Sequence, residues 1–140
     1  MKITCPKNQF LYGVNTVSKA VSNKTTMEIL QCILIEAFDD CIKITANDTE
    51  LGIETVIQGT ILEPGKIALE AKIFSEIIKK IPDNDVYIET DEAGKTNIEC
   101  EQKFYVHQGK LRSVYYFQYL KVHLSSIYYF HYPIRKKLSV

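Results

Sequence analysis

The chain has 140 residues, of which 46% are hydrophobic and 24% charged, and its net charge is zero. This size and composition are typical of one globular domain with a full hydrophobic core, and they exclude a disordered or fibrous chain. The charge is unevenly distributed, because residues 1–102 hold all 17 acidic side chains and ten lysines, whereas residues 103–140 hold seven Lys or Arg and no acid. Two regions of different composition are therefore joined near residue 102.

The cysteines are far apart and form no C-x-x-C pair, so their spacing does not fit a zinc site. Each lies in or beside an apolar run, which predicts four buried free thiols in a reducing, cytoplasmic environment: Cys5, Cys32, Cys41 and Cys100. The N-terminus lacks the basic and apolar regions of a secretory signal. The longest uncharged run of the C-terminal region, 122–134, is too short and too polar to cross a bilayer. We expect no membrane association, no metal and no other cofactor.

The first half of the chain predicts one helix among several strands. Residues 1–5 favour a short strand, and residues 7–22, which follow Pro6, place apolar side chains at helical spacing. β-Branched and alternating patterns then predict three strands, at 27–37, 41–46 and 51–61.

The second half of the chain repeats this order. It opens with a Pro-Gly turn, a short strand at 67–69 and a helix at 71–80. That helix has an apolar face with the spacing of a helix that packs on a sheet, formed by Ile73, Phe74, Ile77, Ile78 and Ile81. Further strands are predicted at 86–90, at 96–100 and from 103. The pattern β-α-β-β-β thus occurs twice, which predicts an α+β fold with two helices packed on antiparallel sheet.

Four segments, in this order, carry a family resemblance. They are M-K-I-T at the start, K-T-T-M-E-I-L-Q-C-I-L-I-E from Lys24, I-T-A-N-D-T-E-L-G-I-E from Ile44, and P-G-K-I-A-L-E-A-K-I-F-S-E-I-I-K-K-I-P from Pro64. By their order and spacing, residues 1–107 resemble the N-terminal domain of the bacterial DNA polymerase III β subunit, the sliding clamp. The resemblance implies the DNA-clamp fold.

The resemblance also implies a function. Members of this family are ring-shaped, non-catalytic processivity factors of DNA replication, which encircle duplex DNA and tether the replicative polymerase. Three such domains form a subunit, two subunits close the ring, and the helices line the hole. A sliding ring needs positive charge near the phosphates and no base contacts. Double-stranded DNA and further clamp subunits are the expected partners.

The resemblance assigns DNA contacts to five lysines. Lys24 and Lys72 match basic positions that the family places against DNA, while Lys19, Lys79 and Lys80 lie on or near the same predicted elements. For each of them the alternative is an ordinary solvated surface lysine.

A subunit interface is expected at the strand that begins at residue 103. In the family, the last strand of this domain pairs edge to edge with a strand of another subunit. Phe104 and Val106 alternate as that strand requires and match its apolar positions. The alternative for Phe104 is closure of the domain's own core.

No catalytic residue set is found in the sequence. The paired acids Asp39-Asp40, and Asp48 with Glu50, fall in predicted turns, where Asp is favoured because it bonds the local backbone. Neither a Gly-rich phosphate loop nor a Ser/His/Asp set nor a Cys/His pair occurs. We therefore expect turn roles for these acids and no enzymatic activity.

Residues 108–140 depart from the family pattern, since they are rich in Tyr and Phe and show no sustained period. Our hypothesis is a clamp fragment that holds the first domain, 1–107, followed by an out-of-frame or disordered tail. The family's groove for the polymerase and the clamp loader lies between its second and third domains, so those partners are expected to need regions absent here. The alternative is a stand-alone module that caps an intact clamp, or whose basic, aromatic tail binds nucleic acid or an anionic membrane surface.

Overall fold

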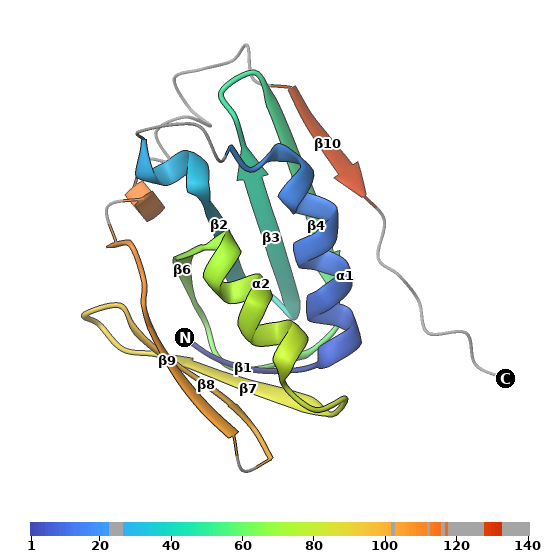
Figure 1. Ribbon diagram of the computed structural model, residues 1–140, viewed down its shortest axis with the longest axis vertical. Helices are drawn as coiled ribbons and strands as arrows, with labels where there is room; N and C mark the ends of the chain where they lie inside the picture. Colours follow the sequence, from blue (N-terminus) through green and yellow to red (C-terminus); the bar gives the residue numbers. More distant parts are fainter. Residues whose placement is uncertain (23–26, 102, 112, 116, 118–127, 133–140) are drawn as a thin grey trace, which may run out of the picture.

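The computed structural model describes residues 1–22, 27–101, 103–111, 113–115, 117 and 128–132 (Figure 1). The α-helices include α1 (Lys7–Val17) and α2 (Ala71–Lys80), and two short 3-10 helices are η1 (Ser18–Ala20) and η2 (Glu28–Gln31). The strands are β1 (Lys2–Pro6), β2 (Cys32–Phe38), β3 (Cys41–Asn47), β4 (Leu51–Ile57), β5 (Thr60–Glu63), β6 (Gly65–Glu70), β7 (Asp85–Thr90), β8 (Lys95–Cys100), β9 (Lys103–Gln108) and β10 (Tyr128–Tyr132).

The strands form two five-stranded sheets that exchange strands between the two halves of the chain. Sheet I has the order β5-β1-β7-β8-β9, and sheet II has the order β10-β4-β3-β2-β6. The first strand of each β-α-β-β-β unit therefore lies in the sheet of the other unit, β1 beside β7 and β6 beside β2. All pairs are antiparallel except that of β10 with β4. The expected α+β fold is confirmed.

The helices lie side by side on one face of this two-sheet wall (Figure 1). Their apolar faces meet at Phe10 and Phe74, whose rings pack edge to face with centroids 6.0 Å apart. The core between the helices and the sheets draws on both sheets, as the fully buried side chains of Ile35 on β2 and Ile88 on β7 show. Both halves of the chain thus contribute to a single core.

Residues 7–22, predicted as one helix, divide in the structure. α1 ends at Val17, η1 follows, and Val21 is extended. The side chains of Thr16 and Ser18 donate hydrogen bonds to the carbonyl oxygens of Tyr12 and Val14, at 2.7 and 2.6 Å. Such bonds compete with the helical backbone pattern, which accounts for the early end of α1.

The strand predicted at 51–61 is two strands in different sheets, because β4 belongs to sheet II and β5 to sheet I. The chain crosses between the sheets at Gln58 and Gly59. A Cβ atom on Gly59 would lie 2.7 Å from the Thr4 carbonyl oxygen and equally close to the Ile42 side chain, so only glycine fits this passage. The backbone of Gln58 is held by the Gln9 side chain, which accepts its N–H at 3.1 Å.

The predicted helix at 71–80 is confirmed, but its buried face is shifted from the expected one. Ile73 is 37% exposed, whereas Ala71 is buried at the start of the helix. Residues 28–31, which the sequence predicted to be extended, form η2.

A second, smaller apolar cluster lies on the other face of sheet II. Alternation along β2 sends Ile33 and Ile35 into the main core and the intervening side chains to this outer face. The cluster consists of Ile29, Leu30, Cys32, Leu34, Ala68, Val114 and Phe117. Val114 and Phe117, which lie beyond the expected boundary at residue 107, have helical backbone and are buried.

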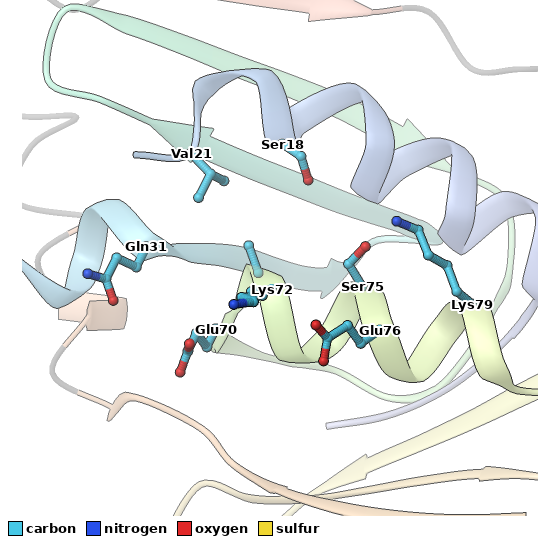
Figure 2. Close-up of a pocket in the computed structure, with 9 residues that line it drawn as sticks. Ser18, Val21, Gln31, Glu70, Lys72, Ser75, Glu76 and Lys79 are labelled. Atoms are coloured by element: carbon cyan, nitrogen blue, oxygen red, sulfur yellow. The ribbon is translucent and has the colours of Figure 1, made fainter. Parts of the chain in front are cut away.

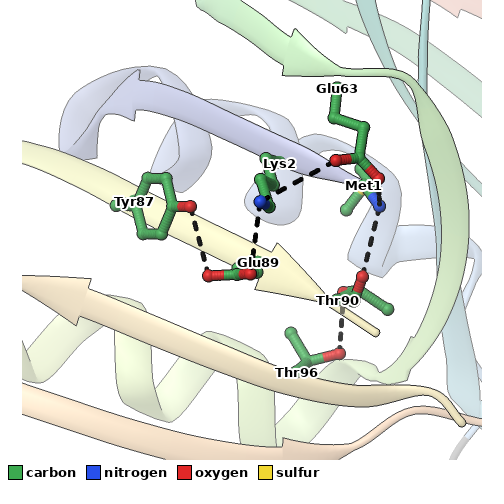
Figure 3. A network of polar contacts seen from close by, with 7 residues as sticks. All are labelled: Met1, Lys2, Glu63, Tyr87, Glu89, Thr90 and Thr96. Carbon is green, nitrogen blue, oxygen red and sulfur yellow. Dashed lines mark hydrogen bonds and ion pairs between the residues drawn. The ribbon is translucent and has the colours of Figure 1, made fainter. Parts of the chain in front are cut away.

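The N-terminal residue is part of sheet I. The Met1 amino group donates a hydrogen bond to the Thr90 carbonyl oxygen at 3.2 Å, and Thr90 returns its N–H to the Met1 carbonyl at 2.9 Å (Figure 3). Lys2 lies between Glu63 and Glu89, with N–O distances of 3.8 and 3.6 Å (Figure 3). These contacts hold β1 between β5 and β7.

The four thiols differ in burial. Burial, reinforced by Asp85, raises the pKa of Cys5 to about 12, and burial raises the pKa of Cys32 to about 11. Burial also raises the pKa of Cys100, whereas Cys41 is half-exposed. Since the thiolate is the reactive form, we predict that a maleimide reagent modifies Cys41 first and the other three only after unfolding, as followed by mass spectrometry.

The control for this prediction is Cys41→Ser, which should lose the fast modification and keep the three slow ones. Rapid modification of two or more sites in the native chain would contradict the burial of Cys5, Cys32 and Cys100.

Candidate nucleic-acid interface

The helix layer differs in charge from the rest of the domain. Residues 7–20 contain Lys7 and Lys19 but no acid, and α2 contains three lysines and a single acid, Glu76. All the remaining acidic side chains of residues 1–102 lie outside these helices. The helical face is therefore locally basic in a domain whose sheets and loops are mainly acidic.

The two helices run in opposite directions, so the end of α1 lies near the start of α2. Between them is an open groove of about 610 Å³, lined by Ser18, Val21, Gln31, Glu70, Ala71, Lys72, Ser75, Glu76 and Lys79 (Figure 2). In Figure 2 the Lys79 side chain extends from α2 toward α1, and Lys72 lies at the start of α2 near Glu70. The groove thus brings together two of the five predicted DNA-binding lysines.

The α2 lysines are exposed and make no ion pair with any residue that the structure describes. Glu76 lies one turn from Lys72 and nearly one turn from Lys79, which reduces the local field without cancelling it. Three exposed cations with one anion form a surface that suits an extended polyanion held loosely.

The other predicted lysines are less well placed or are not described. Lys19 is exposed in η1 and lines a separate shallow hollow with Asn8, Leu11, Tyr12, Asn15 and Thr16. Lys80 is exposed on the last turn of α2 but lines neither hollow. Lys24 lies outside the described residues.

Lys7 has a structural role that the sequence interpretation missed. Its ammonium group donates hydrogen bonds to the carbonyl oxygens of Ile81 at 2.8 Å and Lys79 at 3.4 Å. A cation at the C-terminus of a helix satisfies unpaired carbonyls and interacts favourably with the helix dipole. Lys7 therefore joins the start of α1 to the end of α2. No signal in the sequence indicates this contact, because its partners lie more than 70 positions away.

The open edge of β9 is the second candidate surface. β9 pairs with β8 on one side only. Phe104 is 69% and Val106 64% exposed, while Tyr105 between them packs against the core. The alternative in which Phe104 closes the domain's own core is therefore wrong. Two large apolar side chains on an unpaired strand are typical of a surface that another strand covers.

The end of β9 also contacts the start of α2. The backbone N–H of Glu70 donates a hydrogen bond of 3.4 Å to His107 Nε2. Partial burial lowers the pKa of His107 from its ordinary value near 6.5, opposed by Glu70 and assisted by Lys110. The imidazole is thus held neutral, as an acceptor at the N-terminus of α2.

This contact predicts a pH dependence. A base whose pKa is lower in the folded chain stabilises the fold above its unfolded pKa, and that stability is lost as the pH falls through the folded pKa. We therefore expect the free energy of unfolding of the unmodified chain to fall, relative to His107→Gln, as the pH is lowered from 7.5 to values below 6.5. Urea titrations at several pH values measure this.

His123 and His131 are present in both proteins, so the difference between the two isolates His107. A difference that stays constant with pH would exclude this role for His107.

The paired acids occupy turns, as predicted. Asp39 and Asp40 have φ angles of 51° and 64° between β2 and β3. The Asp48 carboxylate accepts the backbone N–H groups of Glu50 and Leu51 at 3.0 and 2.7 Å. Among the residues that the structure describes, no group of three His, Cys, Asp or Glu side chains could hold a metal ion. Nor does the described part of the chain contain a helix long and apolar enough to cross a membrane.

The comparisons with known proteins agree with this architecture. Residues 1–112 match the family described as DNA polymerase III beta subunit, N-terminal domain. The beta sliding clamp of Bacillus subtilis is 43% identical over 97 residues, which cover 64% of this chain and 26% of that protein. That of Synechocystis is 33% identical over 96 residues, which cover 67% of this chain and 25% of the relative.

Solved structures give the same result. A crystal structure of a putative DNA polymerase III beta subunit from Eubacterium rectale aligns with a TM-score of 0.77 and 61% identity, over 79% of this chain and 30% of that one. The DNA polymerase sliding clamp from Bacillus subtilis aligns with a TM-score of 0.76 and 37% identity, over 79% of this chain and 31% of that one.

Two strand-exchanged sheets behind a pair of helices define a DNA-clamp domain. The match over residues 1–112 shows that the chain belongs to the DNA polymerase III beta subunit family, of which it carries the N-terminal domain. It spans about a quarter of the length of the curated relatives that it matches.

Proposed function

We propose that this chain provides a non-catalytic, DNA-facing wall segment of a sliding clamp, a cytoplasmic processivity factor of DNA replication. The observation that supports this most directly is the segregation of charge, with a basic helix layer and acidic sheets and loops. The family membership and the names of the relatives agree with it.

The proposed contact is with the phosphate backbone of double-stranded DNA. Lys72, Lys79 and Lys80 are exposed on the helix that would face the duplex, and the same role is proposed for Lys19 in η1 and for Lys24. Point charges on flexible side chains hold phosphates without reading bases. Such contacts suit a protein that moves along DNA, since they are similar at every position.

In this proposal the open edge of β9 pairs with a strand of another clamp subunit, and Phe104 and Val106 pack at that junction. The polymerase and the clamp loader would bind parts of the full-length relatives that this chain does not span.

The two lysines that line the groove, Lys72 and Lys79, allow a test of DNA binding. We predict that the double variant Lys72→Met and Lys79→Met binds a fluorescent duplex more weakly than the unmodified chain in anisotropy titrations between 20 and 200 mM salt. The slope of log K against log salt should become shallower by about one for each phosphate that the variant no longer neutralises.

The matched control is the double variant Lys95→Met and Lys103→Met, which removes two exposed lysines from sheet I. Its slope should be unchanged. The same decrease in both variants would indicate a non-specific effect of net charge and would refute the assignment to α2.

A second candidate function is favoured by the open β9 edge, namely a stand-alone module that caps a strand edge of an intact clamp. Both functions predict that the chain binds a full-length sliding clamp subunit in size-exclusion chromatography. The double variant Phe104→Asp and Val106→Asp should weaken this association about tenfold or more, because burying one such side chain contributes about 1.5–3 kcal/mol.

Leu62→Asp is the control for this prediction, because Leu62 is 60% exposed on β5 at the opposite edge of sheet I. It should leave the association unchanged. An equal loss with Leu62→Asp, or no complex with any variant, would argue against β9 as the contact. A complex that forms without displacing a clamp subunit would favour the capping module.

A further inference from the structure

β10 is a parallel fifth strand at the edge of sheet II (Figure 1). Its five residues pair in continuous register with Leu51–Thr55 of β4. Parallel strands require a long connection, and β10 follows β9 by 19 residues. β10 lies within residues 103–140, the region that contains no acidic side chain.

Without β10, β4 would be an exposed edge of the kind that promotes association. It is seven residues long, and its side chains at Ile53 and Thr55 are buried. Its one charged side chain, Glu54, is paired with Lys43 at 3.2 Å. Long edge strands without free charge or proline offer backbone groups to other chains.

The remaining edges are protected or already assigned. β5 is only four residues long, and its pairing with β1 is irregular. Just after β9, the Lys110 N–H donates to the carbonyl oxygen of Ala68 on β6 at 2.8 Å. With β10 in place, β9 is the one long apolar edge left uncovered among the strands that the structure describes.

The edges of β9 and β4 lie in different sheets and have different sequences. If both were uncovered, β9 of one copy could pair with β4 of the next, and a contact between unlike surfaces can continue from copy to copy. We propose that β10 is an internal edge cap, which blocks the β4 edge against β9 of a second copy of this chain. The cap limits the chain to a single edge partner, and it does not depend on the proposed DNA contacts.

The test disrupts β10 in the full chain. The double variant Tyr129→Pro and Phe130→Pro removes two successive backbone N–H groups from β10. Successive N–H groups of a strand point to opposite sides, so at least one of the two is directed at β4. Sedimentation velocity should show no species larger than a dimer for the unmodified chain. For the proline variant, the mass should rise beyond a dimer as concentration increases.

Adding Phe104→Asp and Val106→Asp to the proline variant should restore the smaller species, because it removes the apolar side chains of the β9 edge. Hydrogen exchange supplies an independent measurement, in which those amides of Leu51–Thr55 that point toward β10, and not toward β3, should exchange faster in the proline variant. Slow maleimide modification of Cys5 and Cys32 would show that the domain core remains folded.

Two results would overturn the proposal. One is a proline variant whose β4 amides exchange no faster than those of the unmodified chain. The other is a variant with exposed β4 amides that does not self-associate, or whose oligomers persist after the β9 edge is changed.

Discussion

The exchange of strands between the two halves is the constraint on which the rest of the structure depends. β1 completes the sheet of the second half and β6 completes that of the first, so neither half can form its sheet without the other. The same exchange leaves both helices on one side of the wall and makes the core continuous between them, with Phe10 and Phe74 at its centre. A single cooperative domain is the expected consequence.

This arrangement also creates the basic face. Because the helices run in opposite directions, the end of α1 and η1 lies across a groove from the start of α2, and Lys72 and Lys79 line that groove. At the other end Lys7 bonds the last carbonyls of α2, so one lysine of the layer is structural while its neighbours remain exposed. A residue's position in the helix layer is therefore not sufficient to assign it a role.

The open edges of the two sheets differ. β9 presents Phe104 and Val106 outward and suits a partner strand, while β10 covers the edge of β4. His107, at the end of β9, accepts a hydrogen bond from the backbone N–H of Glu70, the residue that precedes α2.

The sequence by itself determined the α+β class, the twofold β-α-β-β-β order, the limits of α2 and the family resemblance, because periodicity and motif order are local properties of the chain. Helical spacing also placed Lys72, Lys79 and Lys80 away from the apolar face of α2, whereas their assignment to DNA came from the family resemblance. The tertiary structure alone decided the strand exchange, the break at Gly59, the role of Lys7 and the exposure of Phe104. Each of these depends on which distant segment of the chain lies beside a residue. The local sequence pattern does not contain that information.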